Sequence, residues 1–365
     1  MSMTKVSLSD IGILVPDKKE INIIPFQDRK HKLTSIELFA GAGGLALGLE
    51  KAGFDSIALI EFDKSAITTL KSNRPNWNVI HDDIANISIL NLGEYFNIQK
   101  GDLDLLSGGA PCQAFSYAGK RLGLDDARGT LFYHYAVFLR KLQPKTFLFE
   151  NVRGMISHDK GRTYKTILDI FKKEGYTVKA EILNAWDYGV AQKRERLIMI
   201  GIRNDLKGKI SVEFPKKHMY KPVLKDILLD VPNSVGMEYS DYKRKVFEFV
   251  PPGGYWRDIP EDIAKEYMKS CWHMAGGRTG ILRRLSLEEP SLTVLTSPAQ
   301  KQTDRCHPLE VRPFTVRENA RIQSFPDEWE FYGSVGQQYR QVGNAVPVQL
   351  AYEVASKIYE GLMSL

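Results

Sequence analysis

Short apolar segments alternate with helical segments through the first half of the chain, and this alternation constrains the fold more than any other feature. Residues 34–40 (TSIELFA) read as a strand, Gly41, Gly43 and Gly44 as a turn, and LALGLEKAG as a helix that stops at Gly53. Further strand-like runs are SIALI before Glu61, NVIHDD before Ile84, DLDLLSGG before Ala110, TFLFEN after Pro144 and RLIMIGI after QKRER. This pattern predicts an α/β fold with a doubly wound, mostly parallel sheet and helices on both faces.

A change of rhythm divides the chain. Its 365 residues suffice for about two domains of roughly 150 residues each. Between about residues 204 and 313 the alternation gives way to Pro, Gly, Lys and aromatic residues, as in KKHMYKP, PPGGYW and AGGRTG, and helical spacing returns in VRENARIQSF and VPVQLAYEVASKIYEGL. We therefore expect an N-terminal extension (1–32), a sheet domain (33–203), a smaller irregular domain (204–329) and a C-terminal segment (330–365) that packs back on the sheet domain.

Composition excludes several classes of protein. Hydrophobic residues make up 43% and charged residues 26%, and no apolar run approaches the roughly 18 residues of a membrane span, so we expect neither a membrane protein nor a disordered one. Cys112, Cys271 and Cys306 form no C-x-x-C pair, which argues against a disulfide framework and a cysteine-rich zinc site. A reducing compartment is expected, without a secretory signal.

The net charge of +6 permits a polyanionic partner without requiring one. Residues 267–287 contain Lys269, Arg278, Arg283 and Arg284 and no acid. The alternative interpretation of this stretch is an ordinary solvated loop.

The glycine turn predicts a nucleotide-like ligand. Residues 41–46 (GAGGLA) fit G-x-G-x-x-[G/A] between a strand and a helix, and Glu61, twenty residues after Gly41, can accept both hydroxyls of a ribose. Dinucleotides, adenosine-containing methyl donors and a simple tight turn all remain possible. Asp82 and Asp83 end the next strand and suit an adenine amino group, although each acid also suits a helix N-cap. No Lys or Arg lies near the turn, which favours a donor without phosphates.

Cys112 is the candidate nucleophile. It follows an apolar strand in GGAPCQ, and ligands of open α/β sheets bind at the carboxyl ends of strands, whereas a lone cysteine elsewhere is usually a small core residue. A thiol needs nearby positive charge to act at neutral pH, and Arg194 and Arg196 in QKRER are candidates. Glu150 also ends an apolar strand and suits acid–base work, or equally a structural role. The segment after Cys112 is rich in glycine and can move and touch phosphate.

Two other interpretations of the cysteine are weaker. Zinc deaminases of nucleobases carry P-C-x-x-C, but residue 115 is phenylalanine. A cysteine protease needs a histidine beside the thiol, and His81 precedes two acids at the expected cofactor edge.

In this order, FAGAGG, Glu61, DDI at 82–84, GGAPCQAFS, FENV, QKRER, RPFTVRENARIQSFPDEW and QVGNAVPV resemble the cytosine-5 DNA methyltransferase family, of the bacterial restriction-modification type. The resemblance covers residues 34–365 except the irregular domain. Eight ordered blocks make it specific. One departure is Ala110, where the family usually has a second proline.

The resemblance implies a Rossmann-like methyltransferase fold, with S-adenosylmethionine as methyl donor, S-adenosylhomocysteine as product and no metal. The implied donor contacts are Phe39, Gly41 and Gly43 at the methionine end, Glu61 at the ribose, Phe62 and Ile84 around the adenine, Asp83 at its amino group and Asn344 closing the pocket. Cys112 would add to a cytosine rotated out of the duplex, with Glu150, Arg194 and Arg196 around the base. The thiolate addition makes C5 electron-rich, provided that N3 gains a proton.

Double-stranded DNA is then the partner, and the base must leave the helix to react. Gln113, Ser116 and Arg128 in the glycine-rich loop are expected to contact phosphate or fill the gap. The irregular domain becomes the target-recognition domain, with Arg278, Arg283, Arg284 and Thr293 as expected DNA contacts, although any of these arginines equally suits phosphate. A cognate restriction endonuclease acting separately, a monomeric enzyme, a cytoplasmic location at the nucleoid and no membrane partner complete the expectation.

Three alternative functions compete with this one. A transfer-RNA cytosine-5 methyltransferase shares the catalytic blocks, but the Cys-Phe-Thr signature of that branch is absent, and Cys271 stands in Ser-Cys-Trp. A catalytically inactive sequence-specific DNA-binding protein would not need Cys112, Glu150 and Arg194 together. A nicotinamide oxidoreductase is the most distant alternative.

Overall fold

The computed structural model describes residues 32–110, 130–274, 279–298, 300 and 303–365. These residues form one seven-stranded sheet in the order β3-β2-β1-β4-β5-β7-β6. The strands are β1 (Leu33–Leu38), β2 (Phe54–Glu61), β3 (Val79–His81), β4 (Leu105–Gly108), β5 (Thr146–Val152), β6 (Tyr176–Asn184) and β7 (Glu195–Arg203). The first five are parallel, and β7 lies antiparallel to both β5 and β6.

The doubly wound, mostly parallel sheet expected from the sequence is confirmed, with two differences. First, β6 was not expected, because its exposed positions carry Lys179 and Glu181 and give it no continuous apolar run. Second, β7 is antiparallel because it returns directly from β6, without a crossover helix between them.

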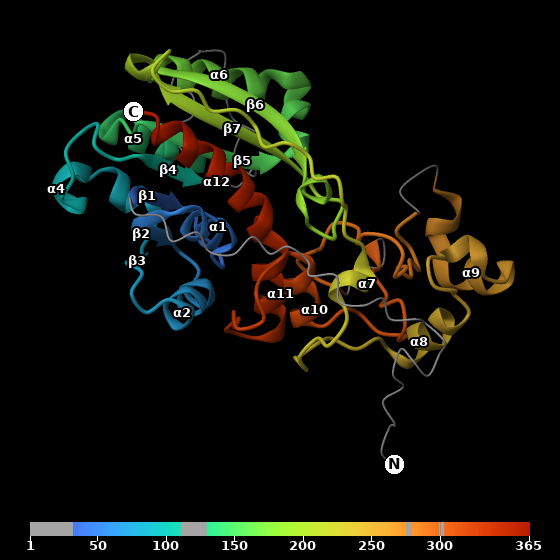
Figure 1. The fold of residues 1–365 in the computed structure, drawn as a ribbon. Coiled ribbons are helices and arrows are strands. Elements are labelled where there is room, and N and C mark those ends of the chain that lie inside the picture. The colour runs from blue at the N-terminus through green and yellow to red at the C-terminus, as the bar shows by residue number, and fades with distance from the viewer. Residues whose placement is uncertain (1–31, 111–129, 275–278, 299, 301–302) are drawn as a thin grey trace.

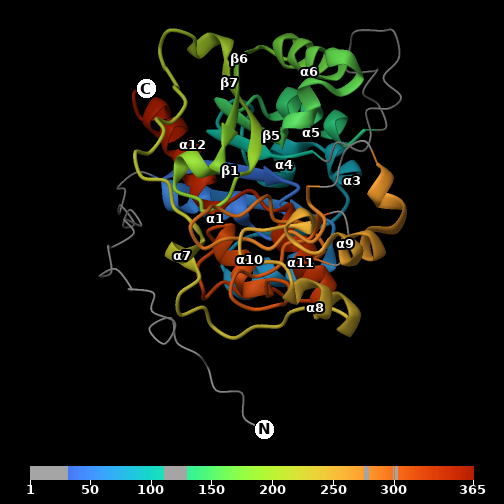
Figure 2. The ribbon, with the colours of Figure 1, turned by 90° about the vertical axis from the view of Figure 1, so that its right-hand side faces the viewer.

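Helices cover both faces of the sheet (Figure 2). One face packs against α1 (Gly44–Ala52) and α12 (Val348–Leu362) in a buried cluster that includes Leu49 and Leu350. The other face packs against α3 (Ile84–Ser88), α4 (Leu92–Phe96), α5 (Leu131–Leu142) and α6 (Arg162–Lys173). The expected helix after the glycine turn is confirmed, with Gly43 and Gly53 at its ends in left-handed conformations that favour glycine.

A second lobe, comprising α7 to α11, lies beside the sheet (Figure 1). Its helices are α7 (Leu224–Ile227), α8 (Asp241–Glu248), α9 (Glu261–Met268), α10 (Val316–Ile322) and α11 (Val335–Asn344). Around α8 and α9, Phe247, Met268 and Leu282 belong to a separate hydrophobic cluster. The two helices expected near the C-terminus form as α10 and α12, and α12 returns to the sheet as expected.

A third cluster joins the two lobes. It contains Leu59 of β2 and Leu70 of α2 (Lys64–Asn73), together with Leu285, Phe314 and Trp329 of the second lobe. Hydrophobic packing therefore crosses the expected boundaries at 203/204 and 329/330.

Short 3-10 helices connect the larger elements: η4 (Arg153–Ile156), η5 (His158–Gly161), η6 (Ala185–Tyr188), η7 (Asn204–Leu206), η8 (Trp256–Asp258) and η9 (Lys269–His273). Within the described ranges, no helix is long and apolar enough to cross a membrane.

Candidate active site

The carboxyl ends of the parallel strands meet at one edge of the sheet. Gly108 at the end of β4 pairs with Leu38 of β1 on one side and with Phe149 of β5 on the other. The residues that follow these strands therefore emerge side by side, as the sequence pattern predicted for a ligand site.

The glycine turn after β1 is tied to Glu61 at the end of β2. The backbone N–H of Gly41 donates to Glu61 Oε2 at 2.7 Å, and Glu61 Oε1 accepts from the N–H groups of Phe62 and Asp63 at 2.9 and 2.8 Å. Phe39, Gly41 and Gly43 all have positive φ, which directs the chain sharply around the strand end. A Cβ built on Gly41 would meet nothing within 4 Å, so the turn is open on that side.

The expected adenine contacts lie beyond the same edge. Phe62 is 70% exposed, so one face of its ring can receive a flat ligand, while Ile84 is only 5% exposed. Asp83 caps α3 by accepting from the N–H of Ala85 at 2.9 Å, which is the N-cap role weighed for this acid. The Asp83 carboxylate thus caps α3 and also lies at the edge of the sheet where the cofactor is expected.

The C-terminal part of the chain packs against the glycine turn. A Cβ on Gly44 would lie 2.2 Å from the carbonyl oxygen of Val346, and Trp329 Nε1 donates to the carbonyl of Ala42 at 3.2 Å. Asn344, two residues before Val346, is exposed at this junction. Its expected position closing the donor site is compatible with this packing.

Glu150 and Arg196 form an ion pair next to the strand that leads to Cys112. Arg196 Nε lies 2.7 Å from Glu150 Oε1, with side chains 12% and 14% exposed. A Cβ on Gly109 would lie 2.6 Å from Glu150 Oε2, so this carboxylate rests directly on the backbone after β4. Asn151 Nδ2 also donates to the carbonyl of Ala110 at 2.8 Å. Glu150 is therefore held against the chain that leads to the expected nucleophile, Cys112.

Five expected site residues lie outside the described residues: Cys112, Gln113, Ser116, Arg128 and Arg278.

Arg194 has contacts other than the base contact expected from the sequence. It is 1% exposed, and its guanidinium donates to the carbonyls of Val294 at 3.3 Å, Gly343 at 2.8 Å and Ala345 at 3.0 Å. Burial lowers the pKa of Arg194 to about 9, which leaves it cationic at neutral pH. Its side chain links main-chain segments, whereas Arg196 of the same block meets Glu150.

The expected DNA contacts within the described ranges each bind another part of the protein. Thr293 Oγ1 donates to the carbonyl of Lys193 at 2.9 Å, and Arg284 Nη1 donates to the carbonyl of Val250 at 3.0 Å. Arg283 lies over the ring of Tyr255, 5.6 Å from its centre. The structure places these three residues in the second lobe, and their contact with bases stays a prediction.

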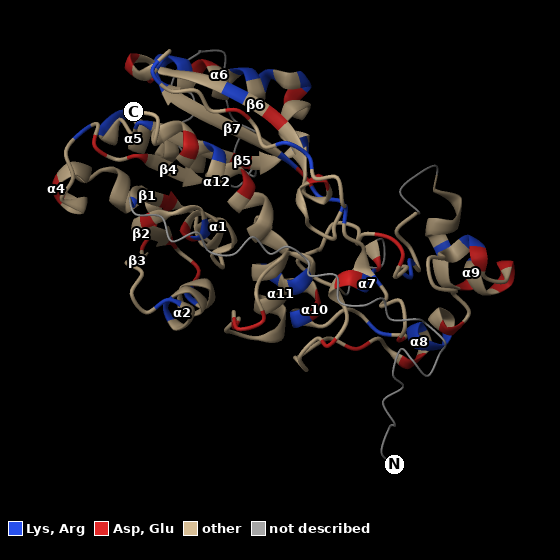
Figure 3. Cartoon of the chain, viewed as in Figure 1, with Lys and Arg blue, Asp and Glu red and all other residues tan. Residues whose placement is uncertain are grey.

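Sequence reasoning missed a cationic cluster around Trp186. Lys193 and Lys221 place their Nζ atoms 5.2 and 4.9 Å from the centre of its ring, and Lys217 and Lys221 pair with Asp187. Figure 3 shows basic residues where β6 ends and β7 begins, next to the second lobe. Only a weak signal for this cluster is present in the sequence. Lys193 follows Trp186 in one segment, and Lys217 and Lys221 stand in a later one.

It also missed Gln192 and Gln323, which are both 0% exposed and hydrogen-bonded to each other at 2.7 Å. Both stand inside blocks that the sequence singled out, QKRER and VRENARIQSF. The burial of Gln323 could have been suspected from the neighbouring Ile322 and Phe325, whereas the charged residues after Gln192 gave no such signal.

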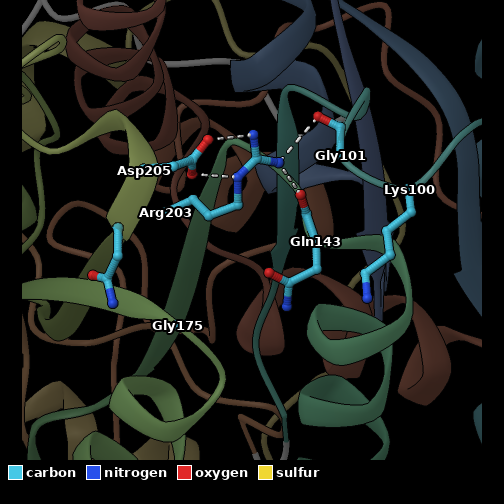
Figure 4. Close-up of a pocket in the computed structure, with 7 residues that line it drawn as sticks. Lys100, Gly101, Gln143, Gly175, Arg203 and Asp205 are labelled. Carbon is cyan, nitrogen blue, oxygen red and sulfur yellow. Dashed lines mark hydrogen bonds and ion pairs between the residues drawn. The ribbon is translucent and has the colours of Figure 1, made fainter.

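A pocket of about 460 Å³ lies at the opposite edge of the sheet (Figure 4). Its wall includes Arg203, which donates to Asp205 and to the carbonyls of Gly101 and Gln143. Arg203 therefore links the segments that precede β4 and β5. Among the described residues, no group of three or more His, Cys, Asp or Glu could hold a metal ion.

Comparison with known proteins decides the family. The family model described as C-5 cytosine-specific DNA methylase matches residues 33–360. The chain belongs to this family. It is a DNA (cytosine-5)-methyltransferase, and the family expected from the ordered blocks, of the bacterial restriction-modification type, is confirmed. Methyltransferases of this family use S-adenosylmethionine.

Relatives with high identity support the assignment of this methylase. Type II methyltransferase M.Sau96I from Staphylococcus aureus is 57% identical over 333 residues, covering 90% of this chain and 76% of the relative. Type II methyltransferase M.Eco47II from Escherichia coli is 51% identical, covering 89% and 78%. The crystal structure of a mutant DNMT2 from Spodoptera frugiperda has a TM-score of 0.63 at 19% identity, covers 90% of this methylase and 99% of that chain, and shows the shared fold.

Proposed function

We propose that this methyltransferase modifies a cytosine rotated out of double-stranded DNA, through a transient covalent bond to Cys112. The observation that carries the proposal is the Glu150–Arg196 pair, which rests on the backbone of Gly109, three residues before the cysteine. A carboxyl group beside the chain that leads to Cys112 suits acid–base work on a pyrimidine that the thiol attacks.

The chemistry needs an acid beside the nucleophile. The Cys112 thiolate adds to C6 of cytosine, and Glu150 donates a proton or a strong hydrogen bond to N3 as charge develops there. C5 then takes up the methyl group, and the donor would leave as S-adenosylhomocysteine. Water or another base takes the C5 proton, N3 returns its proton to Glu150, and Cys112 leaves as the thiolate while the C5–C6 double bond re-forms. Arg196 holds the Glu150 carboxyl group in place, and Glu150 also suits the exocyclic amine that separates cytosine from thymine.

The donor edge fits S-adenosylmethionine. This donor supplies an electrophilic methyl group on a sulfonium. The open glycine turn would hold its methionine end, Glu61 its ribose, and the exposed ring of Phe62 its adenine, opposite Ile84. Asp83 would meet the adenine amino group, and Asn344 would close the site from the C-terminal part of the chain.

Sequence-specific recognition of DNA is assigned to residues 204–329. Arg283, Arg284 and Thr293 are the proposed contacts there, together with Arg278. Lys193, Lys217 and Lys221 around Trp186 add positive charge for the DNA backbone. Gln113, Ser116 and Arg128 are proposed to contact the DNA around the flipped base.

The setting of the reaction follows from the relatives. Their names describe Type II methyltransferases, and this supports protection of host DNA, with a cognate restriction endonuclease acting separately. We assign the enzyme to the bacterial cytoplasm, where its DNA substrate lies, and to a monomeric state, because one chain carries both the catalytic blocks and the recognition lobe.

Covalent trapping tests the proposal. The methylated site is first mapped by bisulfite sequencing of plasmid DNA from an expressing strain. A duplex with 5-fluorocytosine at that site should form a denaturation-resistant complex with the enzyme in the presence of S-adenosylmethionine. The complex persists because fluorine at C5 cannot leave as a proton. Cys112→Ala should give no complex while it retains DNA binding. Trapping by Cys112→Ala, or activity confined to transfer RNA, would count decisively against the proposal.

A further inference from the structure

Three buried polar side chains join segments that lie far apart in the sequence. Gln192 and Arg194 precede β7, and Gln323 follows α10; they are 0%, 1% and 0% exposed. Their hydrogen bonds reach two places: residues 291–296 of the second lobe, here called the recognition segment, and the carboxyl end of α11.

The recognition segment is held through its main chain. The N–H of Val294 donates to Gln192 Oε1 at 2.8 Å, and its carbonyl accepts from Arg194 at 3.3 Å. Ser291 forms a parallel bridge with Gln192, in which Lys193 N–H donates to the Ser291 carbonyl and Ser291 N–H donates to the Ala191 carbonyl, each at 2.8 Å. This segment therefore moves with the chain that enters β7.

The carboxyl end of α11 is held by the same side chains. Arg194 donates to the carbonyls of Gly343 and Ala345 at 2.8 and 3.0 Å. Gln323 Nε2 donates to the carbonyls of Val342 and Ala345 at 2.7 and 3.1 Å. These carbonyls flank Asn344, the residue proposed to close the donor site.

Close backbone packing adds a second link. A Cβ on Gly343 would lie 2.6 Å from the carbonyl group of Leu295 and 2.7 Å from the nitrogen of Thr296. On the other side, the carbonyl of Val346 lies against Gly44 of the glycine turn. The carboxyl end of α11 therefore packs between the recognition segment and the glycine turn.

The chemistry of Arg194 suits a positioning role. A buried cation is costly to desolvate, and Arg194 is hydrogen-bonded to carbonyl groups, while its Nε finds no partner among the described residues. Apolar side chains of similar volume could pack two segments together, but they would leave these carbonyl groups without donors. The planar guanidinium group of Arg194, with its donors in fixed directions, suits a role in placing the two segments relative to each other.

We propose that Gln192, Arg194 and Gln323 are positioning residues that couple the donor site to the recognition segment. A donor that fixes Asn344 also fixes Val294, and DNA that fixes the recognition segment favours donor binding to the same extent. This coupling rests on the proposed donor site and concerns residues that touch neither substrate.

Hydrogen exchange on the unmodified protein tests the coupling without any substitution. Saturation with S-adenosylhomocysteine, in the absence of DNA, should slow amide exchange in residues 291–296 about fivefold or more. Peptides from α6, on the other face of the sheet, should exchange at an unchanged rate. Binding without protection of the recognition segment would overturn the coupling alone, and no binding at all would overturn the donor site as well.

Variants measure the same coupling as a ratio of dissociation constants for S-adenosylhomocysteine, without and with a duplex carrying the mapped site. We expect this ratio to be about 5 or more in the parent. In Arg194→Lys and Gly343→Ala we expect it to fall below about 2, because the coupling is lost. Gly336→Ala, in the same helix and with nothing within 4 Å of its added Cβ, should keep the parent ratio. A lower melting temperature with an unchanged ratio in both variants would reduce the network to a structural role.

Discussion

At the scale of single residues, the site depends on how little space surrounds Glu150. Its carboxylate has Arg196 on one side and the backbone of Gly109 on the other. An acid that must protonate a ring nitrogen has to be held within a few tenths of an ångström of its position. The absence of a side chain at Gly109 therefore leaves the space that the Glu150 carboxylate occupies.

Gly109→Ala should lower turnover while the protein stays folded. The new Cβ would meet Glu150 Oε2 at 2.6 Å and push the carboxylate away from the base, at a position whose φ alanine can adopt. We expect the rate of the methyl-transfer step to fall at least about tenfold, towards the roughly 10²–10⁴-fold loss expected for Glu150→Gln. Single-turnover methylation measures the effect. Gly154→Ala, with open space around its Cβ, should keep the parent rate, and an equal rate in Gly109→Ala would show that Glu150 tolerates displacement.

Sequence could identify the residues of the site better than their partners. Glu61, Glu150 and Arg196 were expected from strand ends and ordered blocks, and the structure brings each to the expected edge of the sheet. Arg194 was expected beside the base, and its carbonyl contacts could not be foreseen, because they come from segments a hundred or more residues away. A one-dimensional pattern shows which residue types occur, but not which main-chain groups face them.

At the scale of helices and strands, the packing of α1 against α12 connects the first and last helices of the sheet lobe. A Cβ on Gly48 would lie 2.4 Å from Ala351 Cβ and 2.7 Å from the nitrogen of Tyr352. The two helices therefore approach more closely than side chains larger than hydrogen would permit at this point.

Gly48→Ala should destabilise the protein, although alanine is the better helix former. The gain in helix propensity is about 1 kcal/mol, and forcing extra volume into a packed contact costs about 1–3 kcal/mol. We expect a lower urea midpoint. The same substitution at Gly336, where there is room for the methyl group, should leave the midpoint unchanged or raise it. A stabilised Gly48→Ala would mean that α12 can move away from α1 without loss.

Strands with continuous apolar runs were predictable, and the edge strand β6 was not. The runs that formed β1, β2, β4 and β5 are buried inside the sheet, so hydrophobicity alone marks them. β6 lies at the edge, where Lys179 and Glu181 can face solvent. The direction of β7 is set by its connection to β6, which apolar periodicity does not encode.

At the scale of the whole molecule, His307 lies between the separate core of the second lobe and the cluster that joins the two lobes. The centres of the His307 and Phe314 rings lie 5.2 Å apart. Nδ1 of His307 accepts from the N–H groups of Leu309 and Glu310, and Nε2 lies 3.7 Å from Glu318 Oε1. Burial lowers the pKa of His307 to about 4, from an ordinary value near 6.5.

This histidine should make stability fall in mild acid. Because its pKa is lower in the folded state, its contribution is complete above about pH 6.5 and is lost as the pH falls towards 4, by about 2 kcal/mol at pH 5. Urea unfolding at pH 7.5 and pH 5 measures the loss. In His307→Asn, which keeps an acceptor for the two N–H groups but does not titrate, the loss between these pH values should be smaller by about that amount. An identical loss in both proteins would place the acid sensitivity elsewhere.

The hydrogen bonds that join Val294 to Gln192 and Arg194 involve its main chain alone, and this has a bearing on how new target sequences arise. Peptide groups are the same in every residue except proline, so neighbouring side chains can be exchanged while the attachment to Gln192 and Arg194 persists. Substitutions in the proposed recognition segment can thus change the side chains offered to DNA while the hydrogen bonds that hold the segment to the chain before β7 persist.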